Sequence, residues 1–147
     1  SLNSSVLEIH KNAVEKALSI GDKIIVFANI QSCVHKNKRS TTLLAFSIRP
    51  VVATNYEAYN SFELSGEVTK ITSTKECHIL LIRTNQNNHE SFVPTVFYHM
   101  DRYLESIKVG DEISVSGIIQ TGKKEYLNEI RYFQNYVGST RSLLKVS

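Results

Sequence analysis

The chain has 147 residues, which is enough for one domain with a substantial core and too few for two full ones. It carries 17 Lys and Arg against 14 Asp and Glu, so the formal net charge is +3. A mildly basic chain permits a polyanionic partner without requiring one. No apolar run approaches the ~18 residues of a membrane-spanning helix, and the start has no signal-peptide pattern. We therefore expect a soluble, cytoplasmic protein with no membrane partner.

The residue types that carry catalysis or bind metals are scattered. Neither Cys33 nor Cys77 has a second cysteine at metal-ligand spacing, and the five histidines are dispersed along the chain. There is no Gly-rich phosphate loop and no nucleophile elbow. Asp111 and Glu112 are adjacent carboxylates, but neighbours in a strand point to opposite faces. We expect no metal, no cofactor and no enzymatic activity.

The first third of the chain predicts a helix followed by a hairpin. Ser5 and Glu8 have capping-box spacing at the start of residues 5–17, whose apolar positions fall on or near one helical face. Residues 23–31 and 41–52 are rich in β-branched and apolar side chains, with a polar, basic stretch between them. This pattern predicts two long strands joined at a basic tip.

Three further strands and a short helix follow a polar connector. The strands are expected at residues 62–72, 77–83 and 91–99. Apolar side chains then recur at spacings of three and four over residues 100–107, which indicates a helix, and Asp101 stands near its start as an N-cap.

The run after this helix predicts a hairpin. From Ile113 to Gln120 apolar and polar side chains alternate with a period of two, which is typical of a half-buried strand. Residues 121–124 supply turn chemistry with two lysines, and residues 126–133 alternate again.

Five strands with a helix between the third and fourth is the order of an OB barrel. The predicted fold class is mainly β: an OB-fold five-stranded barrel with an N-terminal helix and an added β-hairpin. We expect residues 1–54 to form an extension packed on the barrel, residues 55–137 the OB core and residues 138–147 a short basic C-terminal tail. The alternative is that the first hairpin itself supplies barrel strands.

Three runs carry a resemblance to a known family. They are Val96-Phe97; Tyr103-Leu104 with Lys108-Val109-Gly110-Asp111-Glu112-Ile113-Ser114-Val115-Ser116-Gly117; and Tyr126-Leu127-Asn128-Glu129-Ile130. Through them, residues 62–133 resemble the bacterial single-stranded DNA-binding proteins. The resemblance implies an OB barrel that grips single-stranded DNA, with Phe97 at a base-stacking position.

The departures from this family are equally informative. The family stacks bases on tryptophans, and this chain contains none, so stacking must fall to other rings. The family's glycine-rich tail with an acidic tip has no counterpart here. A small, Lys- and Asn-rich version without that tail looks like a relative carried by a plasmid or other mobile element, acting in DNA transfer by conjugation.

Single strands are held by cations along the backbone and by aromatic rings that accept any base. The residues we expect to contact nucleic acid are Lys36, Lys38, Arg39, Arg83, Phe97, Lys123, Lys124, Tyr126, Arg131 and Tyr132. For Phe97 a core position is the alternative, and for the lysine clusters a solvated turn. Tyr126 and Tyr132 are expected on one face of the last strand and Arg131 on the other, whereas Phe133 is assigned to the core.

Two functions follow from this sequence. The first is a sequence-tolerant single-stranded DNA-binding protein that coats or protects the strand in plasmid transfer or replication. RNA and duplex DNA stay open as further ligands, and a homo-oligomer is the expected assembly. The second is an OB-fold protein-interaction or assembly module without intrinsic nucleic-acid binding. In that case the amphipathic helix and the barrel dock on partners or on further copies of the chain.

Overall fold

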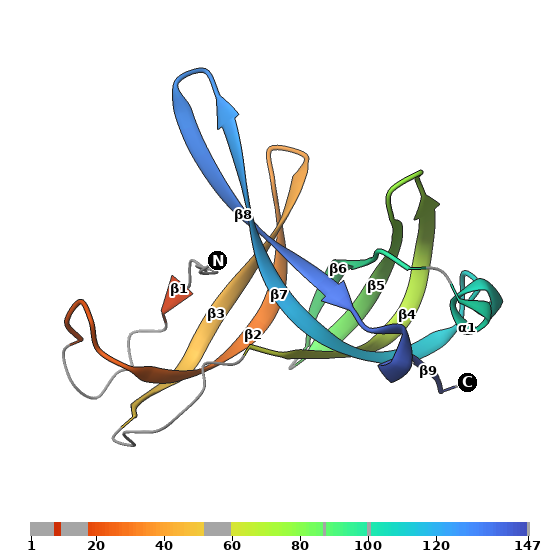
Figure 1. The fold of residues 1–147 in the computed structure, drawn as a ribbon, viewed down its shortest axis with the longest axis horizontal. Coiled ribbons are helices and arrows are strands. Elements are labelled where there is room, and N and C mark those ends of the chain that lie inside the picture. The colour runs from red at the N-terminus through yellow and green to blue at the C-terminus, as the bar shows by residue number, and fades with distance from the viewer. Residues whose placement is uncertain (1–7, 10–17, 52–59, 87, 100, 147) are drawn as a thin grey trace. The chain divides into compact units, whose positions relative to one another are not determined.

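The computed structural model describes residues 8–9, 18–51, 60–86, 88–99 and 101–146 (Figure 1). The chain divides into two compact units. We call Asn60–Ser147 the barrel unit and Val6–Tyr59 the hairpin unit, and describe each by itself.

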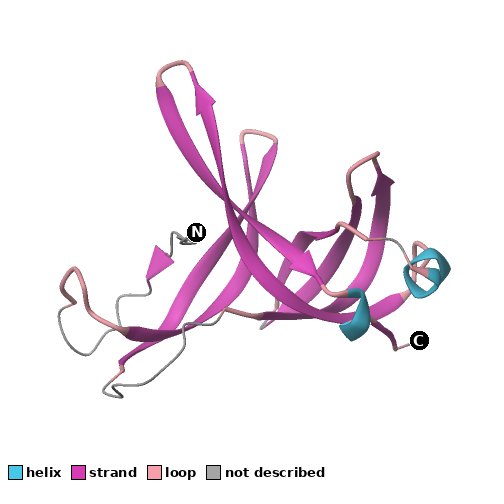
Figure 2. Ribbon diagram, viewed as in Figure 1, coloured by secondary structure: helices cyan, strands magenta, loops and turns pink. Residues whose placement is uncertain are grey.

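Strands dominate the described residues (Figure 2). The elements are β1 (Glu8–Ile9), β2 (Ile24–His35), β3 (Lys38–Pro50), β4 (Phe62–Ser73), β5 (His78–Gln86), β6 (His89–Phe97), α1 (Arg102–Ser106), β7 (Glu112–Tyr126), β8 (Glu129–Gly138), the 3-10 turn η1 (Thr140–Ser142) and β9 (Leu144–Lys145). None of the helices described is long and apolar enough to cross a membrane.

Five strands of the barrel unit close on themselves. Their order is β4-β5-β6-β8-β7, and β7 pairs back with β4. The β6–β8 pair is parallel, and the other pairs of the ring are antiparallel. With α1 between β6 and β7 in the chain, this is the strand order of an OB fold. The prediction of a five-stranded OB barrel is confirmed.

Local sequence explains two features of the barrel. The carboxylate of Asp101 accepts a hydrogen bond from the Leu104 amide at 2.8 Å, so Asp101 caps α1 as predicted. Gly117 lies where β7 meets Phe62 on one side and Gly138 on the other. A Cβ there would stand 1.9 Å from the carbonyl oxygen of Val137, so the backbones approach closely only because this residue is glycine.

The core of the barrel is formed by the inward side chains of all five strands. Its fully buried members include Val68, Leu80, Ile82, Val93, Thr95, Phe97, Ile113, Val115 and Tyr136. The Tyr136 ring meets Phe62 edge to face, with 5.6 Å between ring centroids. The alternation of buried and exposed residues along each strand therefore fixes which side chains remain on the outside.

Burial makes the Tyr136 hydroxyl hard to ionise. Desolvation raises its pKa from 10.0 to about 12. Because the pKa is higher in the folded chain than in the unfolded one, ionisation favours unfolding as pH rises from about 10 to 12. One pKa unit corresponds to about 1.4 kcal/mol, so this residue accounts for about 2 to 3 kcal/mol of alkaline destabilisation.

We expect Tyr136→Phe to lose that part of the pH dependence. Urea unfolding of both proteins at pH 8 and at pH 11.5 measures it, because other tyrosines and lysines titrate equally in the two chains. The free energy of unfolding should fall less for Tyr136→Phe than for the wild type. Equal losses in the two proteins would show that Tyr136 is not buried.

The hairpin unit contains a separate three-stranded sheet of order β1-β3-β2. β2 and β3 are antiparallel around a two-residue turn, and a bulge interrupts the register between Phe27 and Ala28. Among the described residues these strands form no part of the closed barrel, which β4–β8 complete alone.

The predicted N-terminal helix over residues 5–17 is not supported. Glu8–Ile9 form β1, which pairs in parallel with β3 at Leu44 and Ala45, and the rest of that range lies outside the described residues. Pairing with an open strand edge supplies backbone hydrogen bonds that an apolar spacing of three and four does not reveal.

The last residues of the chain pack on the barrel. Leu143 is buried, and the Ser142 hydroxyl accepts a hydrogen bond from the Ser116 amide at 3.0 Å. β9 then pairs with the start of β7, and the Lys145 ammonium lies 3.3 Å from the carboxylate of Asp111. A hydrogen bond from the Lys108 amide, aided by Lys145, holds the pKa of Asp111 below its usual value. The segment predicted as a basic tail therefore contributes one cation to a structural ion pair.

Candidate nucleic-acid interface

The last hairpin of the barrel turns later than the sequence predicts. β7 runs on to Tyr126, and the turn consists of Leu127 and Asn128, both with positive φ. Lys123 and Lys124 therefore lie within β7 instead of in the turn, opposite Tyr132 and Arg131. The prediction of one strand over residues 126–133 is also wrong, because Tyr126 ends β7 and Tyr132 belongs to β8. We call residues 120–135 of this hairpin the arm (Figure 1).

An aromatic ring lies on the outer side of the arm. Phe133 is the cross-strand partner of Gly122, and a Cβ on that glycine would stand 2.3 Å from Cζ of the ring. The phenylalanine thus lies across the space that the missing side chain leaves, while 43% of the residue remains exposed. A ring held in place in this way can accept a stacked base at little entropic cost.

The two lysines of the arm point to different sides. Inward residues of β7 include Ile113 and Val115, so the even positions Gly122 and Lys124 lie on the outer face. Lys124 therefore shares the face of Phe133, and Lys123 lies on the opposite one. Both are exposed. The side chains of Tyr126, Arg131 and Tyr132 lie outside the described residues, and the structure defines only the backbone register of these three.

A cation and a second aromatic ring lie side by side on the outer face of β5 and β6. Arg83 is exposed between the buried Ile82 and Thr84, and its cross-strand partner is the half-buried Phe92. Phe92 lies three residues before Thr95 on β6, and Phe133 lies three residues before Tyr136 on β8. Thr95 and Tyr136 are partners in the parallel β6–β8 pair. Phe92 was not among the residues predicted from the sequence, and Phe133 was predicted to lie in the core.

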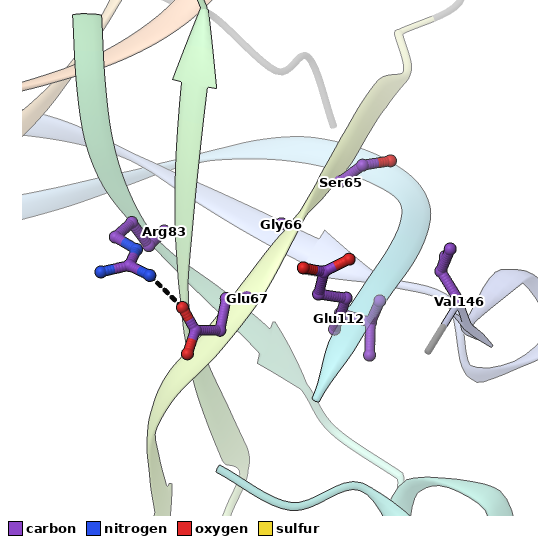
Figure 3. Close-up of a pocket in the computed structure, with 7 residues that line it drawn as sticks. Ser65, Gly66, Glu67, Arg83, Glu112 and Val146 are labelled. Carbon is purple, nitrogen blue, oxygen red and sulfur yellow. Dashed lines mark hydrogen bonds and ion pairs between the residues drawn. The ribbon is translucent and has the colours of Figure 1, made fainter. Parts of the chain in front are cut away.

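Arg83 is already engaged within the chain. Its guanidinium donates a hydrogen bond to Glu67, the cross-strand partner on β4, and forms an ion pair with it (Figure 3). Both side chains are partly exposed, so the pair lies at the surface.

Phe97 takes the core position that the sequence left open as the alternative. The residue is fully buried, and its ring packs against Gly138, where a Cβ would lie 2.5 Å from Cε1. No face of this ring is available to a base in the described barrel.

The basic cluster of the hairpin unit lies at the tip between β2 and β3. Lys36 is in the turn with φ of 49°, and Lys38 and Arg39 begin β3. All three are exposed. These three cations lie together at one hairpin tip. The tip belongs to a different unit from Arg83, Lys123 and Lys124.

One depression of the barrel unit is lined by more carboxylates than cations. It has a volume of about 360 Å³ and is lined by Glu67 and Glu112 together with Ser65, Gly66, Arg83, Ile113 and Val146 (Figure 3). Its lining holds two carboxylates and one arginine, so a phosphate that approaches Arg83 from this side also meets negative charge. Across the described part of the chain no three His, Cys, Asp or Glu side chains gather as metal ligands. Phe133 and Lys124 combine a ring and a cation outside the lining of this depression, and they are therefore the better candidate for contact with a polyanion.

The comparisons with known proteins identify the fold. No family model matches the chain, and no curated protein matches it. Among solved structures, a deletion variant of the single-stranded DNA-binding protein from Thermus aquaticus matches with a TM-score of 0.67 and 17% identity over 88% of this chain and 63% of that one. The wild-type Thermus aquaticus protein matches with 0.64 and 16% over 88% and 62%. The chain has the fold of these proteins.

The extent of the match bears on both units. A third structure, a single-stranded DNA-binding protein of Plasmodium falciparum in complex with single-stranded DNA, matches with a TM-score of 0.49 and 16% identity over 64% of this chain and 100% of that one. The chain spans less than two thirds of the length of the two Thermus aquaticus chains. Because the barrel unit makes up well under 88% of the sequence, the Thermus aquaticus matches extend into the hairpin unit.

Proposed function

We propose that this protein binds single-stranded DNA without sequence preference, on the outer face of its OB barrel. The observation that carries the proposal is the exposed ring of Phe133, held on Gly122 of the arm with Lys124 two residues farther along the same face. Arg83 and Phe92 repeat the combination of cation and ring on β5 and β6. The fold shared with single-stranded DNA-binding proteins supports the same conclusion.

The physical basis is general. Every base offers a π face to an aromatic ring, and every nucleotide offers a phosphate to a cation, so binding by rings and cations tolerates any sequence. We propose a binder and no catalyst. Lys36, Lys38 and Arg39 at the tip of the β2–β3 hairpin, and Tyr126, Arg131 and Tyr132 in the arm, remain proposed contacts.

The wider role stays a prediction of the sequence. We propose that the protein coats the strand in plasmid transfer or replication, that it acts in the cytoplasm, and that its copies associate into a homo-oligomer. RNA and duplex DNA are proposed as further ligands. The boundaries of the extension, the core and the tail also stay predictions.

Binding of a fluorescently labelled oligo-dT, measured by anisotropy, tests the function. Duplex DNA and RNA of equal length serve as comparisons, and the salt concentration is varied. We expect log K for oligo-dT to fall linearly with log salt, by about 0.7 for each phosphate neutralised. Weaker binding of the duplex is expected, since its bases are stacked inside. Absence of binding at low salt would leave the barrel as a protein-docking module.

A further inference from the structure

The ion pair between Arg83 and Glu67 has a consequence for binding. We propose that the Glu67 carboxylate competes with the phosphate of the bound strand for Arg83, so that Glu67 sets the affinity of the barrel face. The inference rests on the proposed function, because it concerns the ligand of the same face.

The register of three strands creates this competition. Glu67 on β4 has Arg83 as its cross-strand partner on β5 and Glu112 as its partner on β7. The guanidinium points toward Glu67, as the dashed line in Figure 3 shows. On its other side Arg83 has Phe92 as partner. The arginine thus lies between a carboxylate that binds it in the free chain and an aromatic ring that can stack a base.

A phosphate must replace the carboxylate to use this arginine fully. Carboxylate and phosphate oxygens both match the guanidinium fork, so they are alternatives for the same donors. The displaced Glu67 then stays close to the phosphate as a like charge, with Glu112 next to it across the sheet. Both effects weaken binding and both depend on a phosphate held at Arg83, so both disappear when Glu67 loses its charge or when Arg83 is removed.

The pair is weak enough to be exchanged. The Arg83 and Glu67 side chains are 45% and 35% exposed. Exposed pairs of this kind contribute little, and their loss corresponds to about two- to five-fold in an equilibrium constant. The competition therefore adjusts the affinity of the face without closing it.

Glu63 provides a matched control for Glu67. It lies four residues earlier on the same outer side of β4, and its partner on β7 is Ser116. Glu63→Gln removes the same charge from the same strand without touching the partner of Arg83. The difference between Glu67→Gln and Glu63→Gln thus isolates the ion pair from the change in net charge.

The test is a double-mutant cycle on oligo-dT affinity. The dissociation constant is measured for six proteins. They are the wild type, the single variants Glu67→Gln, Glu63→Gln and Arg83→Ala, and the two double variants in which Arg83→Ala is combined with one of the glutamine substitutions. We expect Glu67→Gln to bind about two- to five-fold tighter than Glu63→Gln. In the Arg83→Ala background the two glutamine variants should bind equally.

Two results would overturn the inference while leaving the function intact. One is an equal gain for Glu67→Gln and Glu63→Gln in the wild-type background. The other is an advantage of Glu67→Gln that persists without Arg83, because the effect would then be a general charge effect. Failure of all six proteins to bind would instead remove the proposed function, and the inference with it.

Discussion

Phe133→Ala is expected to weaken binding of oligo-dT by roughly 5- to 150-fold, since a stacked base contributes about 1 to 3 kcal/mol. The ring is an exposed aromatic of the arm, and Gly122 leaves the space across which it lies. Its removal takes away a stacking surface without removing a charge. The slope of log K against log salt should therefore stay unchanged while K falls, and anisotropy titrations at several salt concentrations measure both.

Ile130→Ala is the matched control for this variant. Ile130 is on the same strand with a similar exposed fraction, 46% against 43%, and it lies on the other side of the arm, opposite Glu125. Ile130→Ala removes an exposed apolar side chain but no ring on which a base could stack, so we expect its dissociation constant to stay within about two-fold of the wild type. Equal affinities of Phe133→Ala and the wild type, or equal losses in the two variants, would remove Phe133 from the interface.

Phe97→Ala is expected to lower the free energy of unfolding by about 3 to 5 kcal/mol. The residue is fully buried, and its ring fills the space beside Gly138. The alanine leaves a cavity that β6 and β8 cannot close without breaking their short parallel pairing at Thr95 and Val96. Urea denaturation measures the loss.

Two further variants make this result decisive. Tyr98→Ala changes the next residue, which is 48% exposed, and should cost less than about 1 kcal/mol. Phe97→Leu keeps most of the volume, so it should fold if Phe97→Ala does not, at a smaller cost. A Phe97→Ala protein that is as stable as the wild type but binds oligo-dT poorly would restore Phe97 as a stacking residue.

The barrel was predictable because its signals are local. Alternation from Ile113 to Gln120 predicts a strand with one buried side, and Asp101 marks the start of the helix through its own side chain. Each of these patterns is complete within about ten residues. Their order along the chain then allows few folds, and the OB barrel is one of them.

The arm was not predictable in detail, because its turn uses an unusual residue. Gly122 and the lysines after it look like a turn, whereas the turn has Leu127 and Asn128 at positive φ, a conformation that Asn accepts and Leu seldom adopts. The glycine is explained instead by the ring of Phe133 across the strand. A shift of the turn also changes which residues of the two strands lie opposite one another, so Phe133 comes to lie across from Gly122.

The ion pair of Arg83 depends on an irregularity that the sequence does not announce. Counted from the β4–β5 turn, Lys70 pairs with Leu81, and an unbroken register would set Arg83 opposite Val68. A bulge between Val68 and Lys70 shifts the register by one residue, so Arg83 meets Glu67. Val68 is fully buried and Glu67 lies outside, so this single bulge creates the pair.

Photo-crosslinking of an oligo-dT in which iodouracil replaces single thymines would test most directly that the outer face of the barrel holds the strand. Short-range cross-links to aromatic rings identify the stacked side chains by mass spectrometry. We predict cross-links in the peptide that contains Phe133 and in the peptide that contains Phe92, and their loss in Phe133→Ala and Phe92→Ala respectively. Cross-links confined to residues 6–59 would contradict binding on the barrel face.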